Sequence, residues 1–356
     1  MSFQHLLAIE TSCDETAAAI VDQTDDADRP WAVRSSVVAS QVAIHREWGG
    51  VVPELASRQH VRDICGVVER ALADADLSWS AIDAMAVTQG PGLVGSLLVG
   101  VSFAKAAAWS LGRPLVAVHH LAGHIESIWL DHGRIPLPAV VLVVSGGHTN
   151  LYLIRREGEY VLLGRTRDDA AGEAYDKVAK LLGLGYPGGP IVDRLAADGN
   201  ARAIRWPGTR LTNPDRNHPE RDGRFDFSFS GLKTAVLRHV RARQAALGQD
   251  RLPAAEVRDI AASFQRRVVE TLVERTFAAA RWYGARAVGV AGGVSANAHL
   301  RSEMTARGAA VELPVFIPRL SLSTDNAAMI AAAGLRQLAR GRLAPPDLNA
   351  DASLAL

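Results

Sequence analysis

Ala139-Val-Val-Leu-Val-Val-Ser-Gly-Gly-His-Thr-Asn-Leu-Tyr-Leu-Ile154 is the stretch that decides the fold class of this chain. Its first six residues are typical of a buried strand, the small and polar residues after them of a turn, and its last four of a returning strand. The same pattern occurs earlier, where residues 6–9 and 17–21 flank the polar turn Glu10-Thr-Ser-Cys-Asp-Glu15. Two such hairpins about half the chain apart suggest an internal duplication, although unrelated apolar hairpins give the same pattern.

Strands and helices alternate through the rest of the sequence. Apolar spacing and helix-start signals predict helices over residues 53–75, 96–111, 170–182, 230–246, 254–283 and 325–340. Short apolar runs predict strands at residues 84–87 and 287–290. This alternation favours parallel or mixed sheets whose faces are covered by helices. The tail beyond Pro345 is expected to be loose.

Pro136-Leu-Pro138 interrupts the alternation and is the predicted domain boundary. A chain of 356 residues is long enough for two domains of ordinary size. We expect an N-terminal lobe over residues 1–135, with the helix at 325–345 packing back on it. We expect a C-terminal lobe over residues 136–324, with an irregular insertion near 200–226.

The composition narrows the class of protein. Its 39 Lys and Arg residues against 38 acidic residues give a net charge of +1, so any nucleic-acid surface must be a local patch. Cys13 and Cys65 are the only cysteines, which argues against a disulfide framework and fits a reducing compartment. The longest uncharged stretch, residues 91–104, is shorter than the roughly 20 residues that span a bilayer. We therefore expect a cytoplasmic protein without a membrane partner.

His120 and His124 are the strongest candidates for metal ligands. They follow a short apolar run and lie four residues apart in a segment of helical periodicity, so both rings share one helix face. Two imidazoles at this spacing bind one divalent cation in many proteins. A pair of partly buried histidines bonded to backbone carbonyls explains the pattern equally well. Leu121 stands where a zinc protease of the His-Glu-x-x-His type carries its glutamate, so that activity is disfavoured.

Asp325 is the candidate for a third ligand. It stands at the start of a predicted helix, behind Ser323 and Thr324. A carboxylate there would complete a shell of two histidines and one carboxylate, which leaves coordination positions open. Helix capping and the helix dipole explain the residue without any function. Spacing alone does not bring it close to the histidines.

Two glycine-containing turns are candidates for nucleotide binding. In Val144-Ser-Gly-Gly-His-Thr149 the glycines allow backbone N–H groups to face phosphate oxygens, although a tight hairpin turn has the same composition. In Ala291-Gly-Gly-Val-Ser-Ala-Asn297 the backbone can approach a flat ligand, and Asn297 could bond a ribose or a base edge. Asp176, on a predicted helix, is a candidate for a ribose diol, and a solvated helix face is the alternative.

Arginines gather around the irregular insertion and on the helix after it, and such a face could contact RNA phosphates. Acidic residues are interleaved among them, so an ordinary solvated surface is the alternative. The arginines are Arg202, Arg205, Arg210, Arg216, Arg221, Arg224, Arg238, Arg241 and Arg243.

These segments, taken in order, closely resemble the universal tRNA threonylcarbamoyladenosine transferase family, once described as O-sialoglycoprotein endopeptidases. The match runs through nearly the whole chain and is specific as a set. Ser323 is a minor departure, since Cys is common before Thr-Asp-Asn in bacterial members. The matching motifs are residues 9–16, 49–58, 90–95, 119–124, 144–149, 171–177, 186–190, 292–297 and 324–326.

The resemblance implies an α/β fold of the actin/Hsp70/hexokinase-like (ASKHA) type, with two duplicated lobes and a ligand cleft between them. It implies His120, His124 and Asp325 as ligands of one divalent metal per subunit, iron or zinc. It also implies a nucleotide site for the substrate threonylcarbamoyl-AMP, and AMP, ADP or ATP are expected to fit the same site. The residues expected at that site are Val143, Val144, Ser145, Gly146, Gly147, Asp176, Gly189, Asp193 and Asn297.

The implied reaction is transfer of threonylcarbamoyl from threonylcarbamoyl-AMP to the exocyclic amine of adenosine 37 in tRNAs reading ANN codons. Glu10 is expected to assist proton removal, with Asp14 as a second catalytic candidate. The implied partners are tRNA, a metal-lacking paralogue that binds the N-terminal lobe, a small P-loop ATPase and a separate threonylcarbamoyl-AMP synthase. The residues expected to contact tRNA are Arg58, Arg210, Arg224 and Arg238.

Other classes of function remain possible on the sequence alone. An actin-like ATPase that acts as a chaperone or regulatory module would use the glycine turns but does not need the histidine pair. A metalloprotease would use the histidines but lacks the glutamate.

Overall fold

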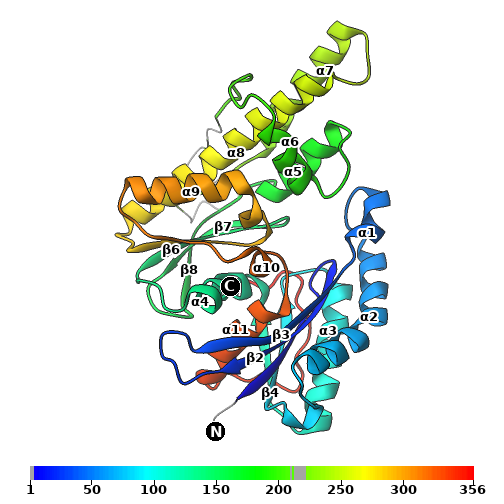
Figure 1. Ribbon diagram of the computed structural model, residues 1–356, viewed down its shortest axis with the longest axis vertical. Helices are drawn as coiled ribbons and strands as arrows, with labels where there is room; N and C mark the ends of the chain where they lie inside the picture. Colours follow the sequence, from blue (N-terminus) through cyan, green and yellow to red (C-terminus); the bar gives the residue numbers. More distant parts are fainter. Residues whose placement is uncertain (1–3, 209–210, 212–221) are drawn as a thin grey trace. The chain divides into compact units, whose positions relative to one another are not determined.

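The computed structural model describes residues 4–208, 211 and 222–356. The chain forms two compact units. The first unit combines Met1–Ile135 with Pro318–Leu356, and the second is Pro136–Ile317. Figure 1 colours the chain along the sequence.

The first unit is built on a five-stranded mixed sheet with the order β3-β2-β1-β4-β5. β1 (His5–Glu10) pairs antiparallel with β2 (Glu15–Gln23), and β2 pairs antiparallel with β3 (Trp31–Ser40). On its other side β1 runs parallel to β4 (Ala84–Gly90), which runs parallel to β5 (Leu115–His119). The carboxyl ends of β1, β4 and β5 therefore meet at one end of the sheet, which we call the first rim.

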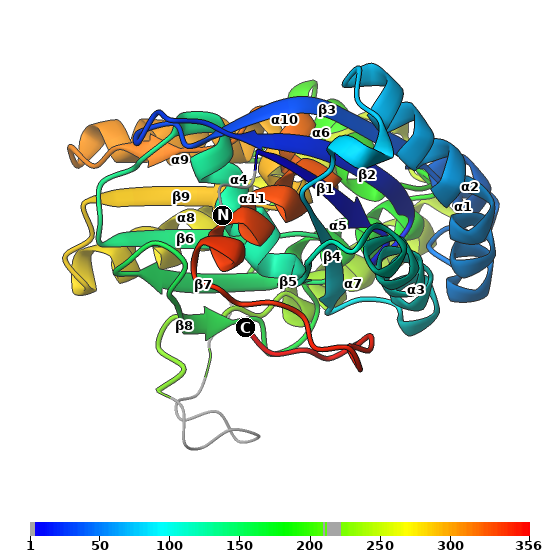
Figure 2. The same cartoon turned by 90° about the horizontal axis from the view of Figure 1, so that it is seen from below.

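Helices cover both faces of the first sheet. Leu7 and Ile9 of β1 form a core with α2 and α3, whereas Gly334 of α11 lies against Leu6 and Ala86 on the opposite face. α11 also packs along α4 (Figure 2). The helices of this unit are α1 (Val42–His45), η1 (Arg46–Trp48), α2 (Pro53–Asp74), η2 (Trp79–Ala81), α3 (Val94–Leu111), α4 (His120–His132), α10 (Leu320–Ser323) and α11 (Ala327–Ala339).

The second unit repeats the first sheet strand for strand, in the order β10-β9-β6-β7-β8. β6 (Ala139–Val144) pairs antiparallel with β7 (Thr149–Ile154), which pairs antiparallel with β8 (Tyr160–Arg165). β6 also runs parallel to β9 (Ala287–Ala291), which runs parallel to β10 (Val315–Phe316). The predicted duplication is confirmed, and the carboxyl ends of β6 and β9 form an equivalent second rim.

The core of the second unit lies between its sheet and its long helices. Phe264 and Leu272 of α8 are buried with Val140 and Leu142 of β6. The helices of this unit are α5 (Ala171–Leu181), α6 (Gly188–Ala197), α7 (Ser230–Leu247), α8 (Ala254–Trp282), η3 (Gly293–Ala296) and α9 (Ala298–Ala310).

β3, β8 and α6 are among the elements that the sequence did not predict. β3 is an edge strand whose serines and Arg34 break the apolar alternation, so backbone pairing with β2 stabilises it. α6 begins inside a glycine- and proline-rich segment, and Pro190 is tolerated there because it falls in the first turn. Within the insertion predicted near 200–226, residues 209–210 and 212–221 lie outside the described part of the chain.

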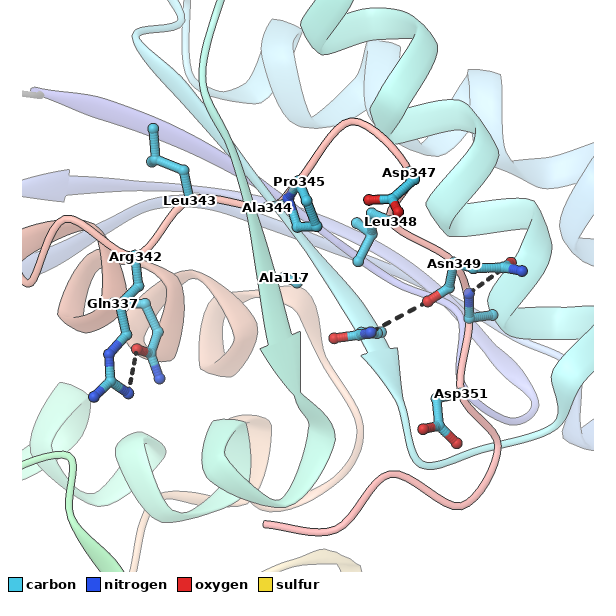
Figure 3. A pocket seen from close by; sticks show the side chains of 12 residues that line it. Ala117, Gln337, Arg342, Leu343, Ala344, Pro345, Asp347, Leu348, Asn349 and Asp351 are labelled. Carbon is cyan, nitrogen blue, oxygen red and sulfur yellow. Dashed lines mark hydrogen bonds between the residues drawn. The ribbon is translucent and has the colours of Figure 1, made fainter.

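The prediction of a loose tail beyond Pro345 is wrong. Residues 343–354, which we call the C-terminal strap, run from the first residue of β5 to the carboxyl ends of β4 and β5 (Figure 3). Ala344 N donates to Leu115 O (2.8 Å), and Asp351 N donates to Gln89 O (2.9 Å). Leu348 is only 5% exposed and joins the core of the first unit. Backbone hydrogen bonds to β4 and β5 hold the strap in place. Such bonds leave no apolar periodicity in the sequence, so the sequence did not predict them.

α3 is the one helix of the described chain that is long and apolar enough to cross a membrane by length and composition. It packs against α2 and β4, and Leu97, Val101 and Ala104 are buried. We therefore interpret α3 as a core helix of the first unit.

Candidate functional site

Ionisable side chains gather at the first rim because three parallel strands end there. Glu10 is the last residue of β1 and is fully buried. Its Oε2 accepts a hydrogen bond from Thr88 Oγ1 of β4 (2.6 Å), and its Oε1 accepts one from Ser12 N. Oε2 also lies 3.1 Å from His120 Nδ1, at the start of α4. These contacts compensate the burial of a carboxylate, which is costly without partners.

The three residues predicted as metal ligands lie together at the first rim. His120 and His124 are one turn apart on α4, with ring centroids 4.8 Å apart. Asp325 Oδ1 lies 3.5 Å from His120 Nε2 and 3.1 Å from His124 Nε2. One ligand atom from each residue lies within 4.8 Å of the others. Adjacent ligands of a tetrahedral ion with bonds of about 2.1 Å lie about 3.4 Å apart, so this spacing suits one ion.

The nitrogen atoms of His124 are consistent with a ligand role. The residue is fully buried, and its Nδ1 makes no hydrogen bond to any residue that the structure describes. Its Nε2 lies 3.1 Å from Asp325 Oδ1. Buried polar atoms are normally paired, and a metal ion is one partner that explains the exception. Two histidines and one carboxylate are donors that iron and zinc accept.

His120 is held with one nitrogen toward Asp325. Its Nδ1 faces Glu10 Oε2 and also lies 3.2 Å from Ser12 Oγ. Nε2 is therefore the nitrogen on the Asp325 side. A carboxylate that fixes the second nitrogen of a ligating histidine is a common arrangement in metal sites.

The electrostatics of the first rim reflect an excess of carboxylates. Burial lowers the pKa of His124. Burial also acts to lower the pKa of His120, but Asp325 and Glu10 outweigh it and raise that pKa to about 9. Burial, together with Asp325 and Asp14, raises the pKa of Glu15 to about 10. A cation at this rim would offset the negative charge of these groups.

Asp325 differs in position from the sequence-based expectation. It was placed at a helix start, where capping would explain it, but Asn326 is the N-cap of α11 and its Oδ1 accepts from Met329 N (2.9 Å). Asp325 precedes the cap, so its carboxylate is directed to the histidines. Asp14, the second catalytic candidate, is buried in the turn after β1.

The residues predicted to bind a nucleotide surround the second rim. Val143 and Val144 end β6, and the turn after them is closed by a hydrogen bond from Ser145 N to His148 O (2.8 Å). A Cβ added to Gly146 or Gly147 would meet nothing within 4 Å. The turn is therefore open on the side of these two glycines and offers its backbone N–H groups to a ligand.

A glycine at the start of α5, which sequence reasoning missed, completes this turn. A Cβ at Gly172 would lie 2.6 Å from Ser145 O, so only glycine lets the first turn of α5 approach so closely. Gly172 N donates to Ser145 O (3.2 Å). The N-terminus of α5, with its partial positive charge, is thereby placed beside the turn.

The polar residues predicted at this site link its segments. Asp176 Oδ1 accepts from Gly188 N (2.7 Å), next to the predicted Gly189, which joins α5 to α6. Asp193 Oδ2 accepts from Ala298 N (3.0 Å), which joins α6 to α9. Asn297 caps α9. The residues predicted to bind a nucleotide thus lie around one end of the second sheet. The side chains of Asp176, Asp193 and Asn297 also hold the backbone there through hydrogen bonds.

Asn297 has a second partner that the sequence did not reveal. Its Nδ2 donates to Gln265 Oε1 of α8 (2.8 Å). Gln265 carries no motif signal, and only the packing of α8 reveals it.

The arginines expected to contact tRNA are spread over both units. Arg58 of α2 has a side chain that is 75% exposed. Arg224 stacks on exposed Trp282, with the guanidinium 4.0 Å from the ring centroid. Arg238 is exposed on α7. Arg210 lies outside the described residues, and the role of this group stays a prediction.

Residues 32–332 match the family model described as tRNA N6-adenosine threonylcarbamoyltransferase. The chain belongs to the tRNA N6-adenosine threonylcarbamoyltransferase family. A relative of that name from Moorella thermoacetica is 53% identical over 353 residues, which is 99% of this chain and 97% of the relative. Another from Koribacter versatilis is 49% identical over 381 residues, with 99% and 98% coverage. The predicted family and the predicted transferase class are confirmed, and tRNA is the substrate that the family name gives.

Solved structures confirm the predicted fold class of this chain. Full-length HypF in its phosphate- and nucleotide-bound form matches with a TM-score of 0.58 at 12% identity, over 94% of this chain and 46% of that one. Component A of (R)-2-hydroxyglutaryl-CoA dehydratase from Acidaminococcus fermentans matches with a TM-score of 0.50 at 11% identity, over 95% and 100%. Both have the actin-like ATPase fold, and at these identities they show the fold alone.

Proposed function

We propose that this chain transfers threonylcarbamoyl from threonylcarbamoyl-AMP to N6 of adenosine 37 in tRNAs reading ANN codons. Family membership supports the acyl group and the acceptor. The observation that carries the assignment to this chain is the convergence of His120, His124 and Asp325 at the first rim. An intact ligand set distinguishes an active member from a chain that keeps only the fold.

The proposed metal site uses His120 Nε2, one nitrogen of His124 and the carboxylate of Asp325. These donors suit iron or zinc and leave coordination positions open. When bound, such an ion supplies a fixed positive charge that stabilises the phosphate or the threonyl carboxylate of the donor. Glu10 orients His120 through Nδ1.

The proposed donor site uses the second rim. Backbone N–H groups of Gly146 and Gly147, which follow Ser145 in the turn, and the N-terminus of α5 suit the phosphate of the adenylate. Asp176 and Asn297 are the candidates for its ribose and base edge. Val143, Val144, Gly189 and Asp193 complete the proposed lining.

The reaction needs positioning more than covalent catalysis. The adenosine amine attacks the carbonyl carbon of the threonylcarbamoyl group, the bond from that carbon to the phosphate oxygen breaks, and AMP leaves with the bonding electrons. One proton leaves N6 for a base. Because the carboxyl–phosphate bond is already activated, no Ser or Cys nucleophile is required.

Glu10 has two candidate roles, and one variant separates them. If Glu10 accepts the N6 proton, Glu10→Gln lowers the rate of transfer while the metal content stays at the wild-type level. If Glu10 only orients His120, Glu10→Gln weakens metal binding, and transfer falls in proportion to metal occupancy. Full burial and hydrogen bonds from Ser12 N and Thr88 favour orientation. Wild-type activity and metal content in this variant would contradict both roles.

The other partners are proposed on the strength of the resemblance and of surface features. Exposed Ile44, Trp48 and Val61, along α1 to α2, offer an apolar face to a paralogue of similar fold. Arg58, Arg224 and Arg238 are proposed tRNA contacts. A P-loop ATPase, a threonylcarbamoyl-AMP synthase and a cytoplasmic location belong to the same proposal.

A reconstituted transfer assay tests the proposed function. The purified chain, with candidate partners, receives threonylcarbamoyl-AMP and unmodified tRNA, and digested tRNA is analysed for the modified nucleoside by mass spectrometry. We expect modification with the wild type and transfer about 10³-fold slower with Asp325→Ala. Equal modification by both chains would contradict the proposed site, and no modification by either would contradict the proposed reaction.

A further inference from the structure

The C-terminal strap is anchored to α3, β4 and β5. Lys105 Nζ of α3 donates to Leu348 O (2.8 Å). Gln89 Nε2 of β4 donates to Asn349 O (3.2 Å) (Figure 3). A Cβ at Gly90 would lie 1.8 Å from Asp351 O, so the strap occupies the space that a side chain would take. The strap therefore packs directly against the backbone at the end of β4.

The last anchor of the strap is a histidine beside the proposed metal ligands. His119 ends β5, directly before His120. Its Nε2 lies 3.0 Å from Leu354 O of the strap, and its Nδ1 accepts from Leu121 N (3.1 Å). The ring thus joins the strap on one side to the first turn of α4 on the other. His119 is the N-cap of the helix that carries His120 and His124.

This pair of contacts requires one tautomer of His119. A neutral imidazole has one N–H donor and one acceptor nitrogen. Nδ1 must accept the Leu121 N–H, so the proton lies on Nε2, where it donates to the Leu354 carbonyl. Without that carbonyl, the proton can move to Nδ1, where it would oppose the Leu121 N–H and abolish the cap.

We propose that the C-terminal strap positions the metal ligands of α4, because Leu354 O fixes the tautomer in which His119 caps that helix. His119 is a positioning residue and the strap is its support. A lost N-cap lowers the equilibrium constant for forming the first turn of a helix by about fivefold, and the first turn of α4 contains His120. Loss of this support should therefore weaken metal binding by about the same factor.

The inference rests on the proposed metal site, and Co²⁺ titration of the full chain tests it. One variant ends at Ala352, which removes Leu354 but keeps the Gly92 N to Ala352 O contact. A matched control ends at Ala355, so that Leu354 keeps its amide carbonyl. We expect Co²⁺ to bind the chain ending at Ala352 about fivefold more weakly than wild type, with an altered visible spectrum. The control should bind within about twofold of wild type.

A double-mutant cycle separates this mechanism from general loosening of the rim. His119→Ala removes the cap and should weaken Co²⁺ binding about as much as the truncation does. Asn at the N-cap accepts from backbone without a tautomer, so His119→Asn should restore binding and make it insensitive to the truncation. Truncation that weakens His119→Asn and wild type equally, or leaves wild type unchanged, would overturn the proposal.

A second measurement keeps this inference distinct from the proposed function. Nitrogen-15 NMR of labelled histidine, assigned with His119→Asn, reports which nitrogen of His119 carries the proton. We expect protonation at Nε2 in wild type and its loss in the chain ending at Ala352, with or without metal. An unchanged tautomer would overturn the role of the strap. A wild-type chain with this tautomer that binds no Co²⁺ would overturn the proposed metal site.

Discussion

The two rims of this protein share one frame and differ in chemistry. In each unit an antiparallel hairpin continues into parallel strands, and the first strand ends at a four-residue turn. The last residue of that strand is Glu10 in the first unit and Val144 in the second, and both are fully buried. The first rim then presents histidines and carboxylates, whereas the second presents an open turn of small residues.

The difference teaches that duplication fixes where a site can form, and that the residues after each strand decide what it binds. In α/β sheets, ligands bind at the carboxyl ends of the strands, and both proposed sites lie at such ends. The proposed metal ligands come from equivalent places in the two repeats. His120 and His124 follow the fifth strand of the first repeat, and Asp325 follows β10, the fifth strand of the second.

The largest expected effect comes from removing a ligand at the first rim. Asp325→Ala should reduce the metal content of the purified chain to near zero and slow transfer about 10³-fold, because the ion contributes several kcal/mol of charge stabilisation. Nucleotide binding at the second rim should persist. Elemental analysis and calorimetry measure the two separately. His132→Ala, in the last turn of α4, is the matched control. Full metal content in Asp325→Ala would break the comparison.

The reciprocal change at the second rim should spare the metal. Gly146→Val fills the open side of the turn, where a Cβ meets nothing of the protein, so the fold tolerates it but a phosphate does not. We expect transfer to fall about 10²-fold through misplacement of the donor. Gly231→Ala, also open on its Cβ side, is the control. Tight adenylate binding by Gly146→Val would refute the role assigned to this turn.

A helix glycine packs closely against the turn after the first strand in each unit, namely Gly100 against Thr11 and Gly172 against Ser145. Replacing either glycine by a larger residue should destabilise the protein to a similar extent. A Cβ at Gly100 of α3 would lie 2.4 Å from Thr11 Oγ1, as one at Gly172 of α5 would crowd Ser145. Alanine at either site should destabilise the protein by about 1–3 kcal/mol through overpacking. Urea denaturation measures both. A stability loss confined to one unit would show that only one turn depends on close helix packing.

The smallest effect concerns pH and a histidine that supports the first turn only. His60 is fully buried, its Nε2 donates to Cys13 O (3.0 Å), and burial lowers its pKa from 6.5. When the pH falls below 6.5, His60 becomes protonated in the unfolded chain but stays neutral in the folded chain. The contribution of neutral His60 to the free energy of unfolding is therefore complete above pH 6.5, and it decreases as the pH falls toward the lower pKa of the folded state. Between pH 7.5 and 5.5, wild type should lose more unfolding free energy than His60→Asn. Equal losses would exclude His60 as a source of the pH dependence.

The sequence predicted those parts of the molecule that side-chain patterns encode. Apolar runs marked β1, β6 and β9, and the histidine spacing marked one face of α4. Edge strand β3 and the C-terminal strap were missed because backbone pairing holds them. The proximity of Asp325 to His124 was not deducible from spacing, since packing of α11 along α4 creates it.

The contacts that hold the proposed metal ligands were even less visible in the sequence. Thr88 and Ser12 occur in no motif with a chemical meaning of its own, yet both donate to Glu10, which faces His120. His119 looked like a neighbour of the ligand pair, and its capping role depends on the Leu354 carbonyl at the far end of the chain.

The most direct test of the account is anomalous diffraction from crystals of the purified chain, recorded at the absorption edge of the metal that elemental analysis finds. The account predicts one anomalous peak about 2.0–2.2 Å from His120 Nε2, from a His124 nitrogen and from an Asp325 oxygen. A metal peak elsewhere, or no peak between these three side chains in active protein, would contradict it.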